Sequence, residues 1–373
     1  MEKIKLFFKS HPNLIAGIKL VFFLYLFFLS LELMGGAMKI FGKEFAHTLI
    51  KTTSNPFVGL FIGILATSVI QSSSSTTSIV VGMVAGGALN IANAIPIIMG
   101  ANIGTSITNT IASLPQINRS NEFRRAFAAA TVHDFFNFLS VIVLFPLQIF
   151  TNFLGGASAA LAGAFQNVGG LKFLSPVKAI TKPVAKYTIA ELKNGLGDGD
   201  LYKWIALIIS LLFLFVALKY MTDSLKVLIL SKAKAWFDKV LFKTAPRAMV
   251  VGLILTVLVQ SSSITTSLVV PMAGAGLLTL IQIFPYTLGA NIGTTVTAIL
   301  AALLTGNLAA VTVAFAHLLF NISGIIVWWP LKKVPLTIAE KFSEYSIKNK
   351  LIPVAYVVIL FFIIPLLVIF MAN

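Results

Sequence analysis

The sequence predicts an all-α integral membrane fold made of two inverted repeats, each with a re-entrant helical hairpin and a broken helix. Three observations support this prediction. Hydrophobic residues make up 58% of the 373 residues and charged residues only 11%, whereas a soluble domain carries about 25% charged residues. Long apolar segments recur along the chain, and one polar segment occurs twice with the same spacing. The chain therefore cannot cover a water-facing surface, and we place it in a bilayer.

Crossing a bilayer takes about 20 apolar residues. Candidate spans lie near 13–35, 89–113, 126–150, 201–222, 278–304, 308–331 and 351–371. Two further apolar segments, 56–88 and 246–277, are interrupted by polar clusters and leave arms of about 15 residues, too short to span comfortably. Irregular backbone at membrane depth is tolerated only where protein buries it or a wet cavity meets it. We therefore expect each segment to enter the membrane as a hairpin and turn back.

The order of these segments divides the chain into two similar halves. Each half holds one span, one hairpin and two more spans, so an odd number of crossings inverts the second half. Segments 36–53, 224–245 and 336–350 alternate lysine with apolar residues and are expected to be interfacial helices. The predicted organisation is a first repeat at 1–150, a linker at 151–200, a second repeat at 201–335, and an interfacial helix with a last span at 336–373.

The positions of lysine and arginine predict the orientation in the membrane. With the N-terminus in the cytoplasm, the predicted inside segments hold 17 of these cations and the outside segments, including the linker, hold 8. This excess follows the positive-inside rule. The net charge of +16 thus reflects orientation, and no basic domain with interleaved aromatic residues indicates a nucleic-acid partner. We expect a multi-pass protein of the cell inner (plasma) membrane with a cytoplasmic N-terminus.

The most polar segments form the best-preserved internal repeat. Residues 71–77 read QSSSSTT and residues 260–266 read QSSSITT, and GANIGT follows each cluster at 100–105 and 289–294. Over the 38 paired positions that begin at the two clusters, 20 residues are identical without a gap. A duplication that served only core packing should preserve its apolar positions best. A duplicated polar cluster in apolar sequence instead predicts a ligand site where the two halves meet.

The two QSSS clusters have the chemistry of a combined oxyanion and sodium site. Hydroxyls and an amide at membrane depth are costly unless they are satisfied. A hairpin tip exposes hydroxyls together with the N–H groups of a helix N-terminus, which bind oxyanions, and uncharged oxygens suit a desolvated monovalent cation. The alternative is that the hydroxyls only join helices. Seven polar residues in a row, present twice, favour the site.

The GANIGT segments predict helix breaks whose freed carbonyls, asparagines and threonines coordinate ions. The alternative is a kink or close packing at small residues. The repeat indicates Asn102 and Asn291 as candidate phosphate ligands, and Gln71 and Thr105 as candidate sodium ligands.

A third repeated pattern places histidine and asparagine four residues apart on one helical face, at 133–137 and 317–321. Asp134 lies beside the first histidine. Such residues in a membrane helix are more often buried, satisfied partners than catalysts. The chain has no cysteine, no G-x-S-x-G, S-x-x-K or H-E-x-x-H pattern and no P-loop. We therefore expect no enzyme, no cofactor and no metal other than sodium as the coupling ion.

Several long motifs together closely resemble the type II sodium–phosphate cotransporter family. They are QSSSSTTSIVVGMV, GANIGTSITNTI, EFRRAFAAATVHDFFN, QSSSITTS and NISGII. The resemblance runs through both repeats, over about 55–150 and 246–335, while the flanking helices match mainly in pattern. It implies an inverted-repeat transporter that takes up inorganic phosphate with sodium by alternating access, in an elevator-like motion.

The resemblance also implies which residues bind. The hydroxyls of both tips would cradle phosphate, the second tip would hold one sodium ion, and an asparagine would contribute to a second sodium site. The implied residues are Ser72, Ser73, Ser74, Ser262 and Ser263 for phosphate, and Gln260, Ser261, Thr294, Thr297 and Asn137 for sodium.

One position departs from the family pattern. Electrogenic members carry an Asp three residues before the Glu of EFRRAF, and this chain has Arg119 there. A cation at this position puts one sodium site in doubt. Two sodium ions with HPO₄²⁻ sum to zero charge, so this departure predicts electroneutral cotransport.

Two other functions stay open from the sequence. One is a sodium-coupled carrier of another oxyanion, because residue spacing does not distinguish one tetrahedral oxyanion from another. The other is a phosphate-responsive membrane signalling component without net transport, against which the lack of a sizeable soluble segment argues. No oligomeric state follows from the sequence.

Overall fold

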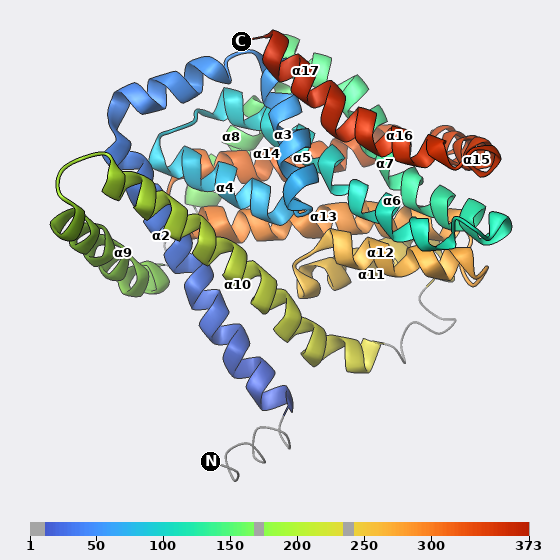
Figure 1. The fold of residues 1–373 in the computed structure, drawn as a ribbon, viewed down its shortest axis with the longest axis horizontal. Coiled ribbons are helices and arrows are strands. Elements are labelled where there is room, and N and C mark those ends of the chain that lie inside the picture. Colours follow the sequence, from blue (N-terminus) through green and yellow to red (C-terminus); the bar gives the residue numbers. More distant parts are fainter. Residues whose placement is uncertain (1–11, 168–174, 234–241, 373) are drawn as a thin grey trace.

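The computed structural model describes residues 12–167, 175–233 and 242–372, and these residues form helices without a strand (Figure 1). Within them, seven helices are long and apolar enough to cross a membrane. These are Asn13–Gly42, Ile91–Gln116, Ser120–Thr151, Leu201–Met221, Leu280–Thr305, Leu308–Trp328 and Leu351–Met371. All seven predicted spans are therefore confirmed as apolar helices of sufficient length.

The first repeat starts with α2 (Pro12–Thr52), which changes direction at Gly42, where φ is 88°. Only glycine adopts this backbone without strain. The predicted interfacial helix at 36–53 is therefore shorter than expected, because residues 36–42 belong to the span. The elements that follow are α3 (Pro56–Ile70), α4 (Ser73–Gly86), α5 (Ile91–Thr105), α6 (Ile107–Ser113), η1 (Leu114–Gln116) and α7 (Ser120–Thr151).

The second repeat presents its elements in the same order. They are α10 (Leu201–Ala233), α11 (Ala245–Val259), α12 (Ser262–Gly274), α13 (Leu280–Thr305) and α14 (Leu308–Trp328). The two predicted hairpins are the pairs α3/α4 and α11/α12, whose longest arms have 15 residues. Such an arm rises about 22 Å, which is short of the roughly 30 Å hydrocarbon core. The arms thus have the length expected of hairpins that turn back inside the membrane.

The linker and the C-terminal part are also helical where they are described. The linker contains α8 (Phe153–Asn167) and α9 (Ser175–Leu196), and the last segment contains α15 (Lys333–Lys348), α16 (Leu351–Val358), η3 (Ile359–Ile363) and α17 (Ile364–Met371). The interfacial helix predicted at 336–350 corresponds to α15. The one predicted at 224–245 is an extension of α10 as far as Ala233, and residues 234–241 lie outside the described part of the chain.

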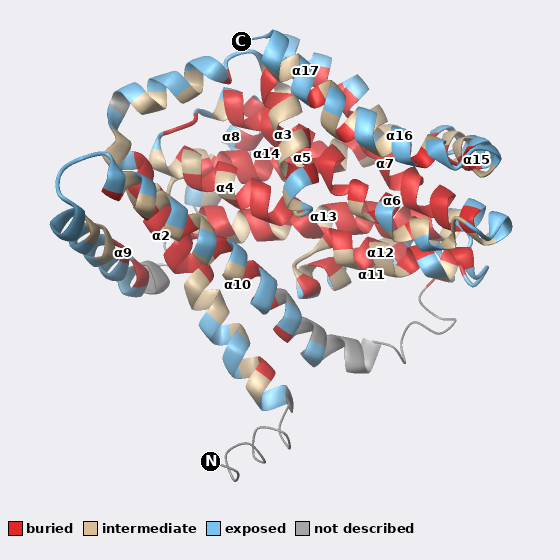
Figure 2. Cartoon of the chain, viewed as in Figure 1, coloured by how far each residue is buried: buried red, intermediate tan, exposed pale blue. Residues whose placement is uncertain are grey.

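Burial separates central helices from peripheral ones (Figure 2). In the span Ile91–Gln116, 83% of the most apolar window is buried, whereas the value is 28% for Asn13–Gly42 and 11% for Leu351–Met371. Exposed apolar side chains on the peripheral helices, such as Phe22 and Phe370, suit contact with lipid tails. The centre, in contrast, gathers the polar residues of both repeats, and it is there that the candidate site must be sought.

Each hairpin packs against the following helix through a pair of glycines. A Cβ atom on Gly63 would lie 2.0 Å from the Ile97 carbonyl oxygen, and one on Gly100 would lie 1.9 Å from that of Leu60. The repeat mates Gly252 and Gly289 meet Tyr286 and Met249 at 2.0 and 1.8 Å. The first glycine of GANIGT therefore serves close backbone packing, which was the alternative interpretation of that motif.

The helix breaks predicted at GANIGT need correction. In the second repeat α13 runs without interruption from Leu280 to Thr305, through residues 289–294. In the first repeat the interruption comes one residue after the motif, at Ser106, which keeps right-handed helical angles. Thr105 donates to the Ala101 carbonyl at 2.9 Å and Thr294 to the Ala290 carbonyl at 3.2 Å. The glycines remove side-chain bulk but leave the backbone hydrogen bonds of the helix intact. These segments therefore do not free the carbonyls that were expected to bind ions.

Candidate functional site

Both hairpin tips are built in the same way. Gln71 and Gln260 end the first arms in the left-handed region, with φ of 55° and 57°, an uncommon conformation for a residue with a side chain. Ser72 and Ser261 then cap the second arms, where they accept hydrogen bonds from Ser75 N–H at 3.2 Å and Ile264 N–H at 3.4 Å. The strained turns thus aim the helix N-termini of α4 and α12, with their unsatisfied N–H groups, at the point where the hairpins reverse.

The two tips meet in the structure. Ser74 Oγ donates to the Gln260 carbonyl at 3.3 Å, although 186 residues separate them. A cavity of about 520 Å³ lies beside this contact. Its polar lining from the tips consists of Gln71, Ser72, Ser74, Ser75, Gln260, Ser261 and Ser263. We call this space the tip cavity, and it brings together six of the fourteen residues predicted to bind phosphate or sodium: Gln71, Ser72, Ser74, Gln260, Ser261 and Ser263.

The second tip contains a fixed glutamine. Gln260 Nε2 donates to the Val257 carbonyl at 2.6 Å, and its Oε1 accepts from Thr297 Oγ1 at 2.7 Å. Gln260 and Ser261 line the tip cavity, whereas Thr297 does not line it and is joined to the tip through this hydrogen bond. Thr294, predicted for the same site, bonds within its own helix. Ser73 and Ser262 are 3% and 2% exposed and do not line the cavity.

The first tip lacks a hydrogen bond that corresponds to the one between Gln260 and Thr297. Thr108, the repeat mate of Thr297, lines the tip cavity, and its Oγ1 is buried without a hydrogen-bond partner among the described residues. The sequence interpretation did not include Thr108, although the constant repeat offset could have identified it. The two tips are therefore alike in sequence but unlike in hydrogen bonding.

The GANIGT asparagines lie in a buried network instead of the tip cavity. His133 Nε2 lies 2.6 Å from Asn291 Oδ1, and Asn291 Nδ2 donates to Asn137 Oδ1 at 2.8 Å. Asn137 Nδ2 then donates to the Asn102 carbonyl at 3.0 Å. His317 Nε2 lies 3.2 Å from Asn102 Oδ1. Asn102 and Asn291, expected to bind phosphate, and Asn137, expected to bind sodium, therefore have protein partners at 3% exposure or less.

This network crosses between the repeats. The histidine of α7 contacts the asparagine of the second repeat, and the histidine of α14 contacts that of the first. It also reaches a hairpin, because Asn109 Nδ2 lies 3.1 Å from His133 Nδ1 while Asn109 Oδ1 accepts from Thr266 of α12 at 2.8 Å. With Nδ1 accepting, His133 is a neutral ring that donates from Nε2. The described contacts thus join α5, α6, α7, α12, α13 and α14 through side-chain hydrogen bonds.

Asp134 is a fully buried carboxylate next to this network. Its Oδ2 accepts from Thr110 at 3.1 Å and from Tyr356 at 2.9 Å, while Oδ1 has no hydrogen-bond partner among the described residues. The arginines at the start of the same helix do not pair with it, because Arg124 pairs with Glu344 at 3.5 Å and Arg125 bonds to backbone carbonyls. A buried carboxylate without a cationic neighbour is costly unless a cation binds it or a proton neutralises it.

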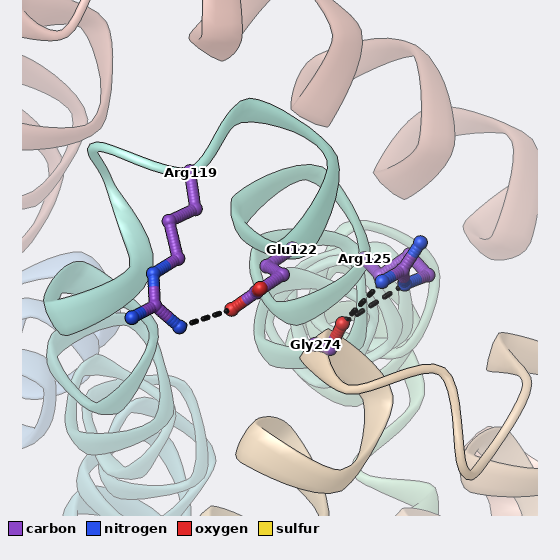
Figure 3. A network of polar contacts seen from close by, with 4 residues as sticks. All are labelled: Arg119, Glu122, Arg125 and Gly274. Carbon is purple, nitrogen blue, oxygen red and sulfur yellow. Dashed lines mark hydrogen bonds and ion pairs between the residues drawn. The ribbon is translucent and has the colours of Figure 1, made fainter.

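The charged start of α7 has a structural role (Figure 3). Arg125 Nε donates to the Gly274 carbonyl at 3.0 Å and to that of Ala273 at 3.2 Å, so it satisfies the C-terminus of α12. Arg119 pairs with Glu122 at 3.1 Å, and its side chain is 73% exposed. Arg119 therefore neither lines the tip cavity nor joins the buried network. Electroneutral cotransport stays a prediction from the sequence.

Apart from the hairpins and Thr108, the lining of the tip cavity comes from α10. Four residues of α10 line it, and none of them was singled out from the sequence: Phe215, Leu218, Lys219 and Asp223. No repeated motif marks these positions, because the resemblance between the repeats is concentrated in the hairpins and the helices that follow them.

Known proteins resemble this chain over most of its length. A sequence profile described as Na+/Pi-cotransporter matches residues 26–175 and 212–332. Sodium-dependent phosphate transport protein 2A of Rattus norvegicus is 36% identical over a gapped alignment of 419 positions, which covers 93% of this chain and 66% of the relative. The 2A protein of Ovis aries is 35% identical over 446 residues (96% and 70%), and the 2B protein of Homo sapiens is 35% identical over 459 residues (98% and 66%). The chain thus spans about two thirds of the length of these relatives. No solved structure matches it. Because the profile covers most of both repeats and these relatives align over nearly the whole chain, the protein belongs to the Na+/Pi-cotransporter family.

Proposed function

We propose that this protein couples the entry of sodium ions to the uptake of inorganic phosphate by alternating access, with an elevator-like motion of the hairpins. The observation that carries this proposal is the contact of two matching tips beside one cavity, to which the tips contribute uncharged hydroxyls and amides. Neutral donors and helix N-termini bind an oxyanion without a permanent ion pair that would hinder release. Phosphate and sodium are also the species in the names of the relatives.

Transport tests this proposal directly. Purified protein in sealed proteoliposomes should accumulate labelled phosphate when sodium is higher outside. Uptake that potassium drives equally well would refute sodium coupling. Competition by sulfate, arsenate and a dicarboxylate tests the alternative of another oxyanion, which would displace labelled phosphate at lower concentration than phosphate itself. Saturable binding without accumulation would instead support the signalling alternative.

The sodium group of the second tip can be tested by removing single oxygens. We expect Gln260→Ala, Ser261→Ala, Thr294→Ala and Thr297→Ala to raise the sodium concentration for half-maximal uptake. The increase should be largest for Gln260 and Thr297, which already share a hydrogen bond, and about tenfold if about 1.4 kcal/mol of binding is lost. Ser267→Ala is the matched control, because Ser267 is assigned to neither ligand and its recorded side-chain hydrogen bond lies within α12. An unchanged sodium response in all four variants would show that this group does not bind sodium.

Asp134 is the candidate for a second sodium site. Its carboxylate lacks a cationic partner in the described part of the chain, and the hydroxyls of Thr110 and Tyr356 already face it. Asp134→Asn keeps the shape and removes the charge, so we expect the dependence of uptake on sodium to become less steep while the protein stays folded. Asp198→Asn, at an exposed ion pair with Lys193, is the control. A sodium dependence as steep as in the unmodified protein would exclude this site.

A further inference from the structure

The tip cavity receives its only charged lining residues from α10 and none from the hairpins, as far as the described residues show. The hairpin contribution is made of hydroxyls, amides and apolar groups, whereas α10 supplies Lys219 and Asp223, one helical turn apart. Ionisable residues in apolar membrane helices are costly and mark ligand pathways. Lys219 lies near the C-terminal end of the apolar span Leu201–Met221, and it is its place in the lining of the tip cavity that calls for a functional explanation.

Lys219 is not engaged in an ion pair with any described residue. No carboxylate oxygen of that part of the chain lies within 4.0 Å of its ammonium group, and its nearest recorded contact is the Tyr220 ring, 5.5 Å from Nζ. Lys203, on the same helix, differs in this respect, because it pairs with Asp200 at 2.7 Å. Lys219 therefore offers an exposed cation on a flexible stem at the edge of the cavity.

The lysine is presented by a helix that is anchored elsewhere. Tyr220 stacks on Phe23 of α2 with 4.9 Å between ring centroids, and Trp204 packs on Phe41 of α2 at 4.8 Å. These two contacts lie near both ends of the span, so α10 is held along α2 while the hairpins meet each other. An ammonium group carried on α10 can thus act on the cavity without forming part of the tips.

We propose that Lys219 is a specificity-determining residue that draws the phosphate dianion into the tip cavity. This inference rests on the proposed function. The neutral tips supply hydrogen bonds of fixed geometry, and Lys219 supplies the positive charge that they lack. A single cation near the mouth of a cavity with low-dielectric walls raises the local concentration of an anion. It should favour HPO₄²⁻ over monovalent oxyanions and should weaken as ionic strength rises.

Substitution with charge rescue tests the role. We expect Lys219→Gln and Lys219→Met to raise the phosphate KM about fivefold, with unchanged kcat and unchanged half-saturation for sodium, since one screened charge interaction is lost. Lys219→Arg should restore the phosphate KM to within about twofold of the original. Added choline chloride at constant sodium should raise the KM of the unmodified protein and leave that of Lys219→Gln nearly constant. Lys203→Gln, on the same helix but ion-paired, should behave like the unmodified protein.

Equilibrium binding separates this inference from the proposed function. Labelled phosphate is titrated into the purified unmodified protein and the Lys219 variants in detergent with sodium present. Phosphate binding without accumulation in vesicles would refute transport, but the effect of the Lys219 substitutions on phosphate affinity could still be measured. A phosphate affinity that is unchanged in Lys219→Gln and Lys219→Met, or equally lost in Lys219→Arg, would overturn the role of the charge. Absence of phosphate binding by the unmodified protein would overturn it as well.

Discussion

Gly289→Ala should prevent the protein from folding stably, although it adds a single methyl group. The new Cβ would lie 1.8 Å from the Met249 carbonyl oxygen and 3.0 Å from the Leu253 nitrogen, so the backbones of α11 and α13 would have to separate. Overpacking against backbone atoms cannot be relieved by a change of rotamer, and we expect a loss of at least about 3 kcal/mol. The measurement is thermal unfolding of the detergent-purified protein, followed by size-exclusion chromatography.

The other glycines of the chain provide controls for this result. Gly100→Ala, the mate in the first repeat, meets the Leu60 carbonyl at 1.9 Å and should be equally damaging. Gly163→Ala in α8 has open space around its Cβ and should be neutral or slightly stabilising, because alanine favours the helix. If Gly289→Ala had the same melting temperature as Gly163→Ala, the inference that α11 and α13 pack closely at Gly289 would be wrong.

His133→Phe should destabilise the protein and impair transport more than any other single substitution in the buried network. Phenylalanine fills similar space but cannot hydrogen-bond, so Asn291 Oδ1 and Asn109 Nδ2 both lose a partner. Each unsatisfied buried polar group costs about 1–3 kcal/mol. Because Asn109 also holds Thr266 of α12, the second hairpin should lose its fixed position, and uptake per folded molecule should fall.

The second histidine makes this prediction quantitative. His317 Nδ1 has no hydrogen-bond partner among the described residues, and the mate of Asn109 in the second repeat is Ala298. His317→Phe therefore removes one recorded side-chain hydrogen bond instead of two, and we expect about half the loss of stability. His47→Phe, at an exposed position of α2, is the control. Equal melting temperatures for the two buried variants would contradict the difference in hydrogen bonding described above.

The elements of this fold could be predicted because the bilayer imposes strict length and polarity requirements. All seven spans were anticipated, and the short arms on either side of Gln71 and Gln260 indicated two hairpins. The duplicated clusters likewise indicated that the two tips belong to one site. Their chemistry is local, since a capping serine after a left-handed turn requires only neighbouring residues.

The partners of the repeated asparagines could not be predicted, because an internal repeat shows which residues are similar and not which residues lie close together. Asn102 and Asn291 repeat as faithfully as the tip serines, yet they face His317 and His133 of the opposite repeat. Such pairing is set by how α5 and α13 cross α14 and α7. The role of the glycines in the same motif could not be predicted either. A glycine can interrupt a helix, or it can, like Gly289, let the backbone of a neighbouring helix pack closely, and the sequence does not distinguish the two.

What the sequence determined by itself is the membrane environment, the number of spans, the two hairpins and the residues at their tips. These follow from composition, segment length and local turn chemistry, each of which acts over a few neighbouring residues. Only the tertiary structure decided that Lys219 of α10 borders the tip cavity, that Arg119 stays at the surface with Glu122, and that the asparagines join the two repeats. These contacts join residues that are far apart in the chain or placed by packing, and no periodicity records how helices pack against one another.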